Sequence, residues 1–72
     1  MNDLKMARFL KGISQAKLAK ETGIDAAIIS RLENDLLRDT PAVLLWKEKI
    51  AGILETPMEV LFPGTTKREN GR

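Results

Sequence analysis

The sequence contains no cysteine and no histidine among its 72 residues. Without cysteine the chain can form no disulfide and no zinc site with cysteine ligands. Without histidine it lacks the side chain that most often acts as a general base and as a metal ligand. No glycine-rich phosphate loop is present, and no pair of carboxylates is placed to form an obvious catalytic site. We therefore predict a protein that is not an enzyme and that uses no metal and no other cofactor.

Long apolar runs and strand patterns are missing as well. The longest apolar run is far too short to span a bilayer, and no basic and then apolar leader precedes a cleavage site. Apolar residues make up 43% of the chain, which is enough to fill a helical bundle, and they do not alternate as in a strand. We expect one small all-α domain in the cytoplasm, without membrane contact and near the lower size limit for independent stability.

Excess positive charge is missing from most of the chain. The formal net charge is +2, and residues 63–72 supply all of it with three basic residues and one acidic residue. Residues 1–62 carry nine basic and nine acidic residues and are neutral. Bulk charge therefore does not argue for a nucleic-acid partner, and only the placement of individual charges can do so.

The most informative stretch is residues 14–34, which read SQAKLAKETGIDAAIISRLEN. Two segments with helical periodicity flank Gly23, which can end the first helix because glycine adopts left-handed conformations at little cost. Ser14 can cap the first segment, and Asp25 can cap the second. The period of 3.6 residues places small or apolar side chains on one face of each segment: Leu18, Ala19, Thr22, Ile29 and Leu32. The pattern predicts a helix, a tight glycine turn and a second helix.

This stretch resembles the helix-turn-helix of the phage Cro and repressor proteins, also called the XRE family. The resemblance covers roughly residues 4–62, and its most specific elements are Ser-Gln-x-x-Leu-Ala, the glycine and Arg-Leu-Glu-Asn in register. It implies a compact five-helix bundle of the lambda-repressor-like type, in which helices 2 and 3 form the helix-turn-helix. It also implies DNA binding as a dimer on a palindromic operator. The alternative for the motif alone is an ordinary pair of antiparallel helices in a small bundle.

Two more helices are indicated by their start signals. The first helix of the chain is capped by Asn2 or Asp3 and runs to about Lys11. The fourth helix starts at Thr40-Pro41 and runs to about Leu54. The expected core positions of these two helices are Leu4, Ala7, Leu44, Ile50, Ala51 and Leu54. Lys47 is the exception, since it stands where the helical period calls for an apolar residue.

The last helix is indicated by residues 56–59, which read Thr-Pro-Met-Glu and match a capping box with proline at the first helical position. Residues 60–62 then contribute Val, Leu and Phe to the core. We expect the helix-turn-helix domain to span residues 1–62 and residues 63–72 to form a flexible polar tail.

The resemblance also implies which residues contact DNA. In the resembled repressors the third helix, here about residues 26–34, contacts bases from its first two positions and from one position a turn further on. These positions hold Ala26, Ala27 and Arg31, and Ser30 can reach a base or a phosphate. Only Arg31 can pair with guanine O6 and N7, a contact worth roughly 1–3 kcal/mol of discrimination, whereas the alanines can touch a thymine methyl group. The resemblance implies phosphate contacts from Gln15, Asn34, Arg38 and, unless it is simply solvated, Lys17.

One structural ion pair is implied in the same way. In the resembled family, an arginine of the first helix pairs with the glutamate of the Arg-Leu-Glu-Asn segment, and these residues are Arg8 and Glu33 here. A bidentate pair would tie the first helix to the end of the recognition helix. The alternative is a solvated arginine.

Several apolar residues exceed what the core needs. Met6, Phe9 and Leu10 either widen the core or form a patch for a partner. The loop leucines either fold back or meet a second subunit, which we prefer, and the tryptophan is either a lid over the core or an interface anchor. The candidate interface residues are Leu36, Leu37, Trp46 and Phe62.

Two functions from different classes follow from these observations. The first is a sequence-specific transcriptional regulator that binds double-stranded DNA as a homodimer. The second is a protein-interaction module on the same fold, antitoxin-like or part of a larger regulatory complex, with weak DNA binding. The first is the leading hypothesis, and the second is motivated by the neutral domain, the alanines of the third helix and the surplus of apolar residues. Salt-sensitive retention on DNA would distinguish the first.

Overall fold

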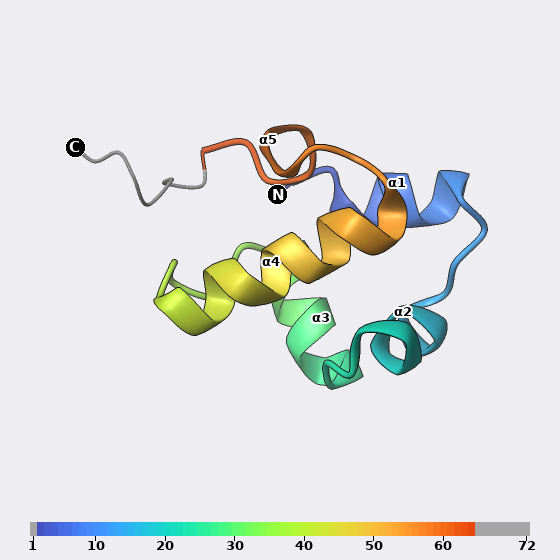
Figure 1. Cartoon of the computed structure of the whole chain (residues 1–72), viewed down its shortest axis with the longest axis horizontal. Helices are drawn as coiled ribbons and strands as arrows, with labels where there is room; N and C mark the ends of the chain where they lie inside the picture. The colour runs from blue at the N-terminus through green and yellow to red at the C-terminus, as the bar shows by residue number, and fades with distance from the viewer. Residues whose placement is uncertain (1, 65–72) are drawn as a thin grey trace.

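The computed structural model describes residues 2–64, which hold five helices and no strand. In chain order they are α1 (Leu4–Leu10), α2 (Gln15–Thr22), α3 (Ala26–Glu33), α4 (Pro41–Leu54) and α5 (Met58–Leu61). The longest helix, α4, runs through the middle of the molecule, with α5 on one side and α2 and α3 on the other (Figure 1). The prediction of an all-α five-helix domain is confirmed. From residue 65 on, the expected tail lies outside the described residues.

The helices begin where short polar side chains can bond to free backbone N–H groups. The side-chain oxygens of Ser14, Asp25 and Thr40 each accept a hydrogen bond from a first-turn N–H, at 3.0, 2.8 and 3.2 Å. Such caps stabilise a helix by about 1 kcal/mol each. Of the two residues expected to cap α1, Asn2 does so through its side-chain oxygen at 3.0 Å, whereas the Asp3 side chain makes no capping hydrogen bond.

The start of α5 differs from the prediction of a capping box. Thr56 does not cap this helix, because its hydroxyl donates to the Leu54 carbonyl oxygen at the end of α4, 2.9 Å away. The helix starts at Met58, and Pro57 precedes it rather than occupying its first turn. Only three residues separate the two helices, and Glu55 is left-handed with φ of 51°. The threonine therefore closes α4 instead of opening α5.

The core is one cluster built from all five helices and the turn between α2 and α3. Its fully or nearly buried apolar members are Leu4, Leu18, Ile24, Ile29, Leu32, Val43, Ile50, Leu54, Leu61 and Phe62, and Leu44 of α4 is buried as well. Burial of each large side chain contributes roughly 1.5–3 kcal/mol. Two expectations need correction. Val60 was expected in the core but is 51% exposed. Phe62 was expected both to close the core and to be a candidate interface residue, and at 1% exposed it belongs to the core.

Lys47 occupies a buried position of α4, as the helical period indicates. Its charge is paired there, since Nζ lies 2.7 Å from Asp39 Oδ1. The same nitrogen lies 4.9 Å from the centre of the Phe62 ring, within the range of a cation–π contact. The expected register of α4 therefore holds, and the lysine fits the core because its charge has partners.

Candidate nucleic-acid interface

The turn between α2 and α3 is fixed by backbone geometry and by one buried hydroxyl. Gly23 adopts the left-handed conformation with φ of 76°, and its N–H donates to the Ala19 carbonyl at 2.8 Å. The Thr22 hydroxyl donates to the Leu18 carbonyl at 2.8 Å and accepts from the Ile24 N–H at 3.2 Å. Because every one of these groups has a partner within the turn, the orientation of α3 relative to α2 is set locally.

Helix α3 has one buried face and one exposed face. Ile29 and Leu32 are buried in the core and anchor the helix. Ser30 and Ala26 are partly buried, and the outer face of the helix and its C-cap expose Ala27, Arg31 and Asn34. The helix can therefore approach another molecule with this face while its packing stays intact.

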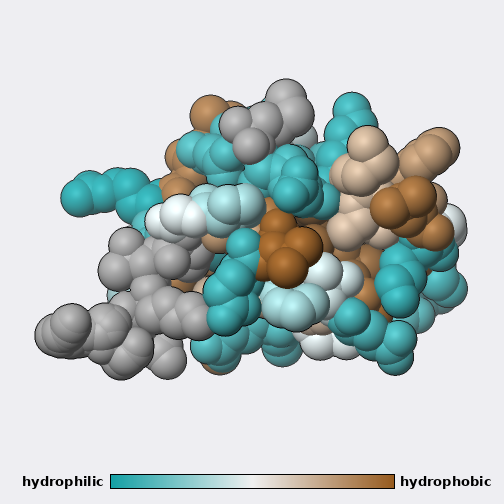
Figure 2. Space-filling model, turned by 90° about the horizontal axis from the view of Figure 1, so that it is seen from above, coloured by the Kyte–Doolittle hydropathy of each residue, from teal (hydrophilic) through white to brown (hydrophobic). Residues whose placement is uncertain are grey.

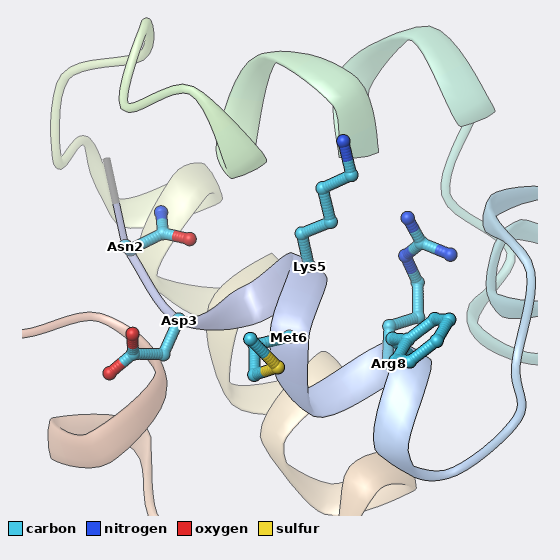
Figure 3. A pocket seen from close by; sticks show the side chains of 6 residues that line it. Asn2, Asp3, Lys5, Met6 and Arg8 are labelled. Atoms are coloured by element: carbon cyan, nitrogen blue, oxygen red, sulfur yellow. The ribbon is translucent and has the colours of Figure 1, made fainter.

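A small polar network joins α1 to the end of α3. Arg8 Nε donates to Glu33 Oε2 at 2.7 Å, and both side chains are largely buried, being 12% and 5% exposed. The arginine extends from α1 toward α3 (Figure 3). The pair implied by the resemblance is present, but it is not bidentate. The guanidinium uses a second donor, Nη1, for the Ile13 carbonyl at 2.9 Å.

The second oxygen of Glu33 is used by Gln15, the first residue of α2. The Gln15 amide nitrogen donates to Glu33 Oε1 at 3.0 Å. One amide hydrogen is thus committed inside the protein and the other remains for an external acceptor such as a phosphate. This bond could not be predicted from the sequence, since no local pattern links residues that lie 18 positions apart.

The other three candidate phosphate contacts lie at the surface. Lys17 is exposed on α2, with Nζ 3.8 Å from the Glu21 carboxylate one turn away. Arg38 is exposed in the connection from α3 to α4. Asn34 is exposed at the end of α3, where its amide donates to the Ser30 carbonyl at 2.9 Å and thereby caps the helix. The exposed candidates therefore lie on α2, at the end of α3 and in the connection that follows it.

The segment that leaves α3 is held by Asn2, a role that no pattern in the sequence indicated. Its amide donates to the Leu32 carbonyl at 2.6 Å and to Asp35 Oδ1 at 2.9 Å. Asp35 is left-handed with φ of 55°, a conformation that aspartate tolerates better than most residues. Burial alone would raise the pKa of the Asp35 carboxyl, but the hydrogen bond from Asn2 and the charge of Lys47 contribute to a net lowering of that pKa.

The expected apolar interface is largely absorbed by the core. Leu37 and Trp46 are partly buried and pack against the core, which favours the alternative that Leu37 folds back and the lid interpretation of Trp46. Phe62 is buried, and only Leu36 of the four candidates is well exposed, at 68%. On α4 the exposed apolar side chain next to the tryptophan is Leu45.

An apolar patch lies instead on α1 and α5. Met6, Phe9 and Leu10 are all more than half exposed on α1, and Val60 is half exposed on α5. On the side of the molecule that carries these helices, hydrophobic residues gather between hydrophilic ones (Figure 2). Met6 lines two shallow grooves, one along α1 and one between α1 and α5. These α1 residues therefore form a patch and do not widen the core.

Comparison with known families agrees with the observed architecture. Residues 4–61 match the sequence model of the helix-turn-helix family of the XRE/Cro type, and the chain belongs to that family. The match spans all five helices. Membership implies DNA binding. No match was found among curated proteins.

Between residues 2 and 64, acidic side chains do not gather into a group of three or more that could hold a metal ion. None of the helices described is long and apolar enough to cross a membrane. The family itself is generally non-catalytic.

Proposed function

We propose that this protein is a sequence-specific transcriptional regulator that inserts α3 into the major groove of DNA. The observation that carries the proposal is the division of α3 into a buried face and an exposed face, with both ends of the helix fixed. Asp25 caps its start, and the pair of Arg8 with Glu33 holds its end. A recognition helix must keep its outer side chains in register with the base edges, and such anchoring provides that register.

Direct base readout is assigned chiefly to Arg31. Its guanidinium can donate two parallel hydrogen bonds to one guanine, the commonest specific contact in the major groove. Ala26 and Ala27 allow the helix to lie close to the bases and can contact a thymine methyl group, and Ser30 adds a hydroxyl. Phosphate contacts that position the helix are assigned to Gln15, Lys17, Asn34 and Arg38.

A homodimer on a palindromic operator follows from the small number of base contacts. One bidentate arginine provides roughly 1–3 kcal/mol of discrimination. Specific regulators bind their sites about 4–10 kcal/mol more tightly than other DNA. Two copies, with their α3 helices in successive major grooves about 34–36 Å apart, would double the number of base contacts.

A comparison of two arginine variants tests this assignment. Arg31→Ala should lower the ratio of affinities for the selected operator and a scrambled duplex about 5- to 150-fold per half-site, the equivalent of 1–3 kcal/mol. Arg38→Ala serves as the control, because loss of a phosphate contact should weaken binding to both duplexes alike and leave the ratio unchanged. Fluorescence anisotropy at one fixed salt concentration measures both ratios. An unchanged ratio for Arg31→Ala would show that Arg31 is not the base reader.

The apolar patch on α1 favours a second candidate function, that of a protein-interaction module. Phe9 and Leu10 are each 77% exposed, and exposed apolar clusters on a small domain usually mark a contact surface. For this function, the purified chain should show no salt-sensitive retention on DNA and should copurify from its native host with one partner in a fixed ratio. Phe9→Lys should abolish that copurification without unfolding the domain, and a variant that still copurifies would argue against the patch as the contact.

A further inference from the structure

Lys47 is a buried charged residue that none of the proposed DNA contacts uses. Its side chain is 7% exposed, although the ammonium group is among the most costly groups to remove from water. Its Nζ lies 2.7 Å from Asp39 Oδ1 and 4.9 Å from the centre of the Phe62 ring, and its charge also acts on the Asp35 carboxylate. These partners come from the connection between α3 and α4 and from the residue that ends α5.

The carboxylate that Lys47 holds belongs to the residue directly after Arg38, the proposed phosphate contact of this connection. Directly after Asp39, the Thr40 N–H donates to the Arg38 carbonyl at 2.8 Å. The Thr40 side chain in turn caps α4. The backbone that presents the arginine is therefore fixed at two adjacent points, and one of these is the ion pair with Lys47.

An ion pair of this kind is not required for stability alone. Well-packed apolar residues of similar volume can replace a buried ion pair with little loss of stability, or even a gain. The helical period of α4 also assigns this position to the core, where leucine or methionine would fit the pattern. What an apolar residue could not do is fix the direction in which the Asp39 carboxylate lies.

We propose that Lys47 is a positioning residue for DNA binding, acting through Asp39 on the backbone that carries Arg38. The ring of Phe62 covers the amine and links the end of α5 to the same point. This inference rests on the proposed function, because it requires Arg38 to contact a phosphate. It adds that the α3–α4 connection is held in its binding conformation from inside the domain.

The test compares two lysines of α4. Lys47→Met and Lys49→Met each remove one positive charge, but Lys49 donates to the Thr22 carbonyl at the end of α2, 3.2 Å away, and not to the α3–α4 connection. Binding to a fluorescein-labelled random-sequence duplex is titrated at several salt concentrations. Loss of one phosphate contact should make the slope of log K against log salt shallower by about 0.9 per bound subunit. We expect this change for Lys47→Met and for Arg38→Ala. Lys47→Met combined with Arg38→Ala should show no further change, and Lys49→Met should keep the wild-type slope.

A second readout needs no DNA. Amide hydrogen exchange of the Thr40 N–H should be faster in Lys47→Met and unchanged in Lys49→Met, at a temperature where circular dichroism shows all variants folded. If Lys47→Met does not fold, Asp39→Asn combined with Lys47→Met removes both charges and leaves none buried alone. The variant with both Asp39→Asn and Lys47→Met should show the same shallower slope and the same faster exchange of the Thr40 N–H.

The outcomes separate the two proposals. If the unaltered chain shows no salt-dependent binding, the proposed function fails, and this role of Lys47 fails with it. If the unaltered chain binds and Arg38→Ala alone changes the slope, the proposed function stands and only the role of Lys47 is contradicted. A change in thermal stability of Lys47→Met with a wild-type slope and wild-type Thr40 exchange would mean that the lysine is merely structural.

Discussion

Two ion pairs of the same chemical type differ sharply in their surroundings. The side chains of Arg8 and Glu33 are 12% and 5% exposed, whereas those of Lys17 and Glu21 are 59% and 45% exposed. Loss of one partner from a buried pair leaves the other charge without compensation. An exposed pair one helical turn apart contributes only about 0.3–0.5 kcal/mol. The buried pair should therefore dominate the response of the domain to the loss of a single charge.

Substitution of the two cations by methionine tests this difference. Arg8→Met should lower the free energy of unfolding by about 3–5 kcal/mol, because Glu33 would remain buried without its cation. Lys17→Met should lower it by less than about 1 kcal/mol. Urea denaturation followed by circular dichroism measures both changes. Equal effects of the two substitutions would contradict the view that burial of the pair holds α1 to the end of α3.

Single residues were predictable where their partners lie close in sequence or where a family pattern names them. The caps at Ser14 and Asp25 depend on groups two or three residues away and were found from spacing alone. The bond between Gln15 and Glu33 and the clamp by Asn2 were not predictable, because they join residues 18 to 33 positions apart. Only the packed fold brings these groups together.

At the scale of the elements, two glycines on helices have opposite roles. Gly23 ends α2 in the left-handed region with φ of 76°, while Gly52 lies inside α4 with ordinary helical geometry. A Cβ atom added at either glycine would meet no atom within 4 Å, so steric contacts do not separate them. The backbone conformation alone should determine the effect of a substitution.

Alanine at each glycine should therefore change stability in opposite directions. Gly23→Ala should lower the free energy of unfolding by about 1–2 kcal/mol, because an L-residue is strained in the left-handed region. Gly52→Ala should raise it by up to about 1 kcal/mol, because alanine is the better helix former. Thermal unfolding of both variants measures the signs. A stabilising Gly23→Ala would mean that the turn can rearrange and does not fix α3.

Helix boundaries could be predicted well at the starts of α2, α3 and α4 and poorly at α5. The sequence of residues 56–59 fits a capping box, but the same threonine hydroxyl can bond to a carbonyl of the preceding helix. With only three residues between the helices, it does so, donating to Leu54. A local motif cannot decide between two neighbouring helices that both offer it a partner, and the same limit left Val60 wrongly in the core.

At the scale of the whole molecule, the sequence could not decide which of the surplus apolar residues are buried and which are exposed. Helical periods identified most of the core, but Trp46 and Leu37 could be either inside or outside until the fold was known. They pack inward, and the exposed apolar surface lies on α1 and α5 instead. The fold was thus largely predictable, whereas the contact surfaces depended on packing between distant segments.

In the proposed function, α3 reads DNA sequence in the major groove. The most direct test is selection of bound duplexes from a random double-stranded library, followed by anisotropy titration of the enriched and scrambled duplexes at two salt concentrations. If α3 reads sequence, the selection should enrich a palindrome with half-sites about one helical turn apart and guanine at one position of each half-site. Binding that enriches no sequence and disappears at moderate salt would contradict sequence reading by α3, because phosphate contacts alone would then explain the affinity.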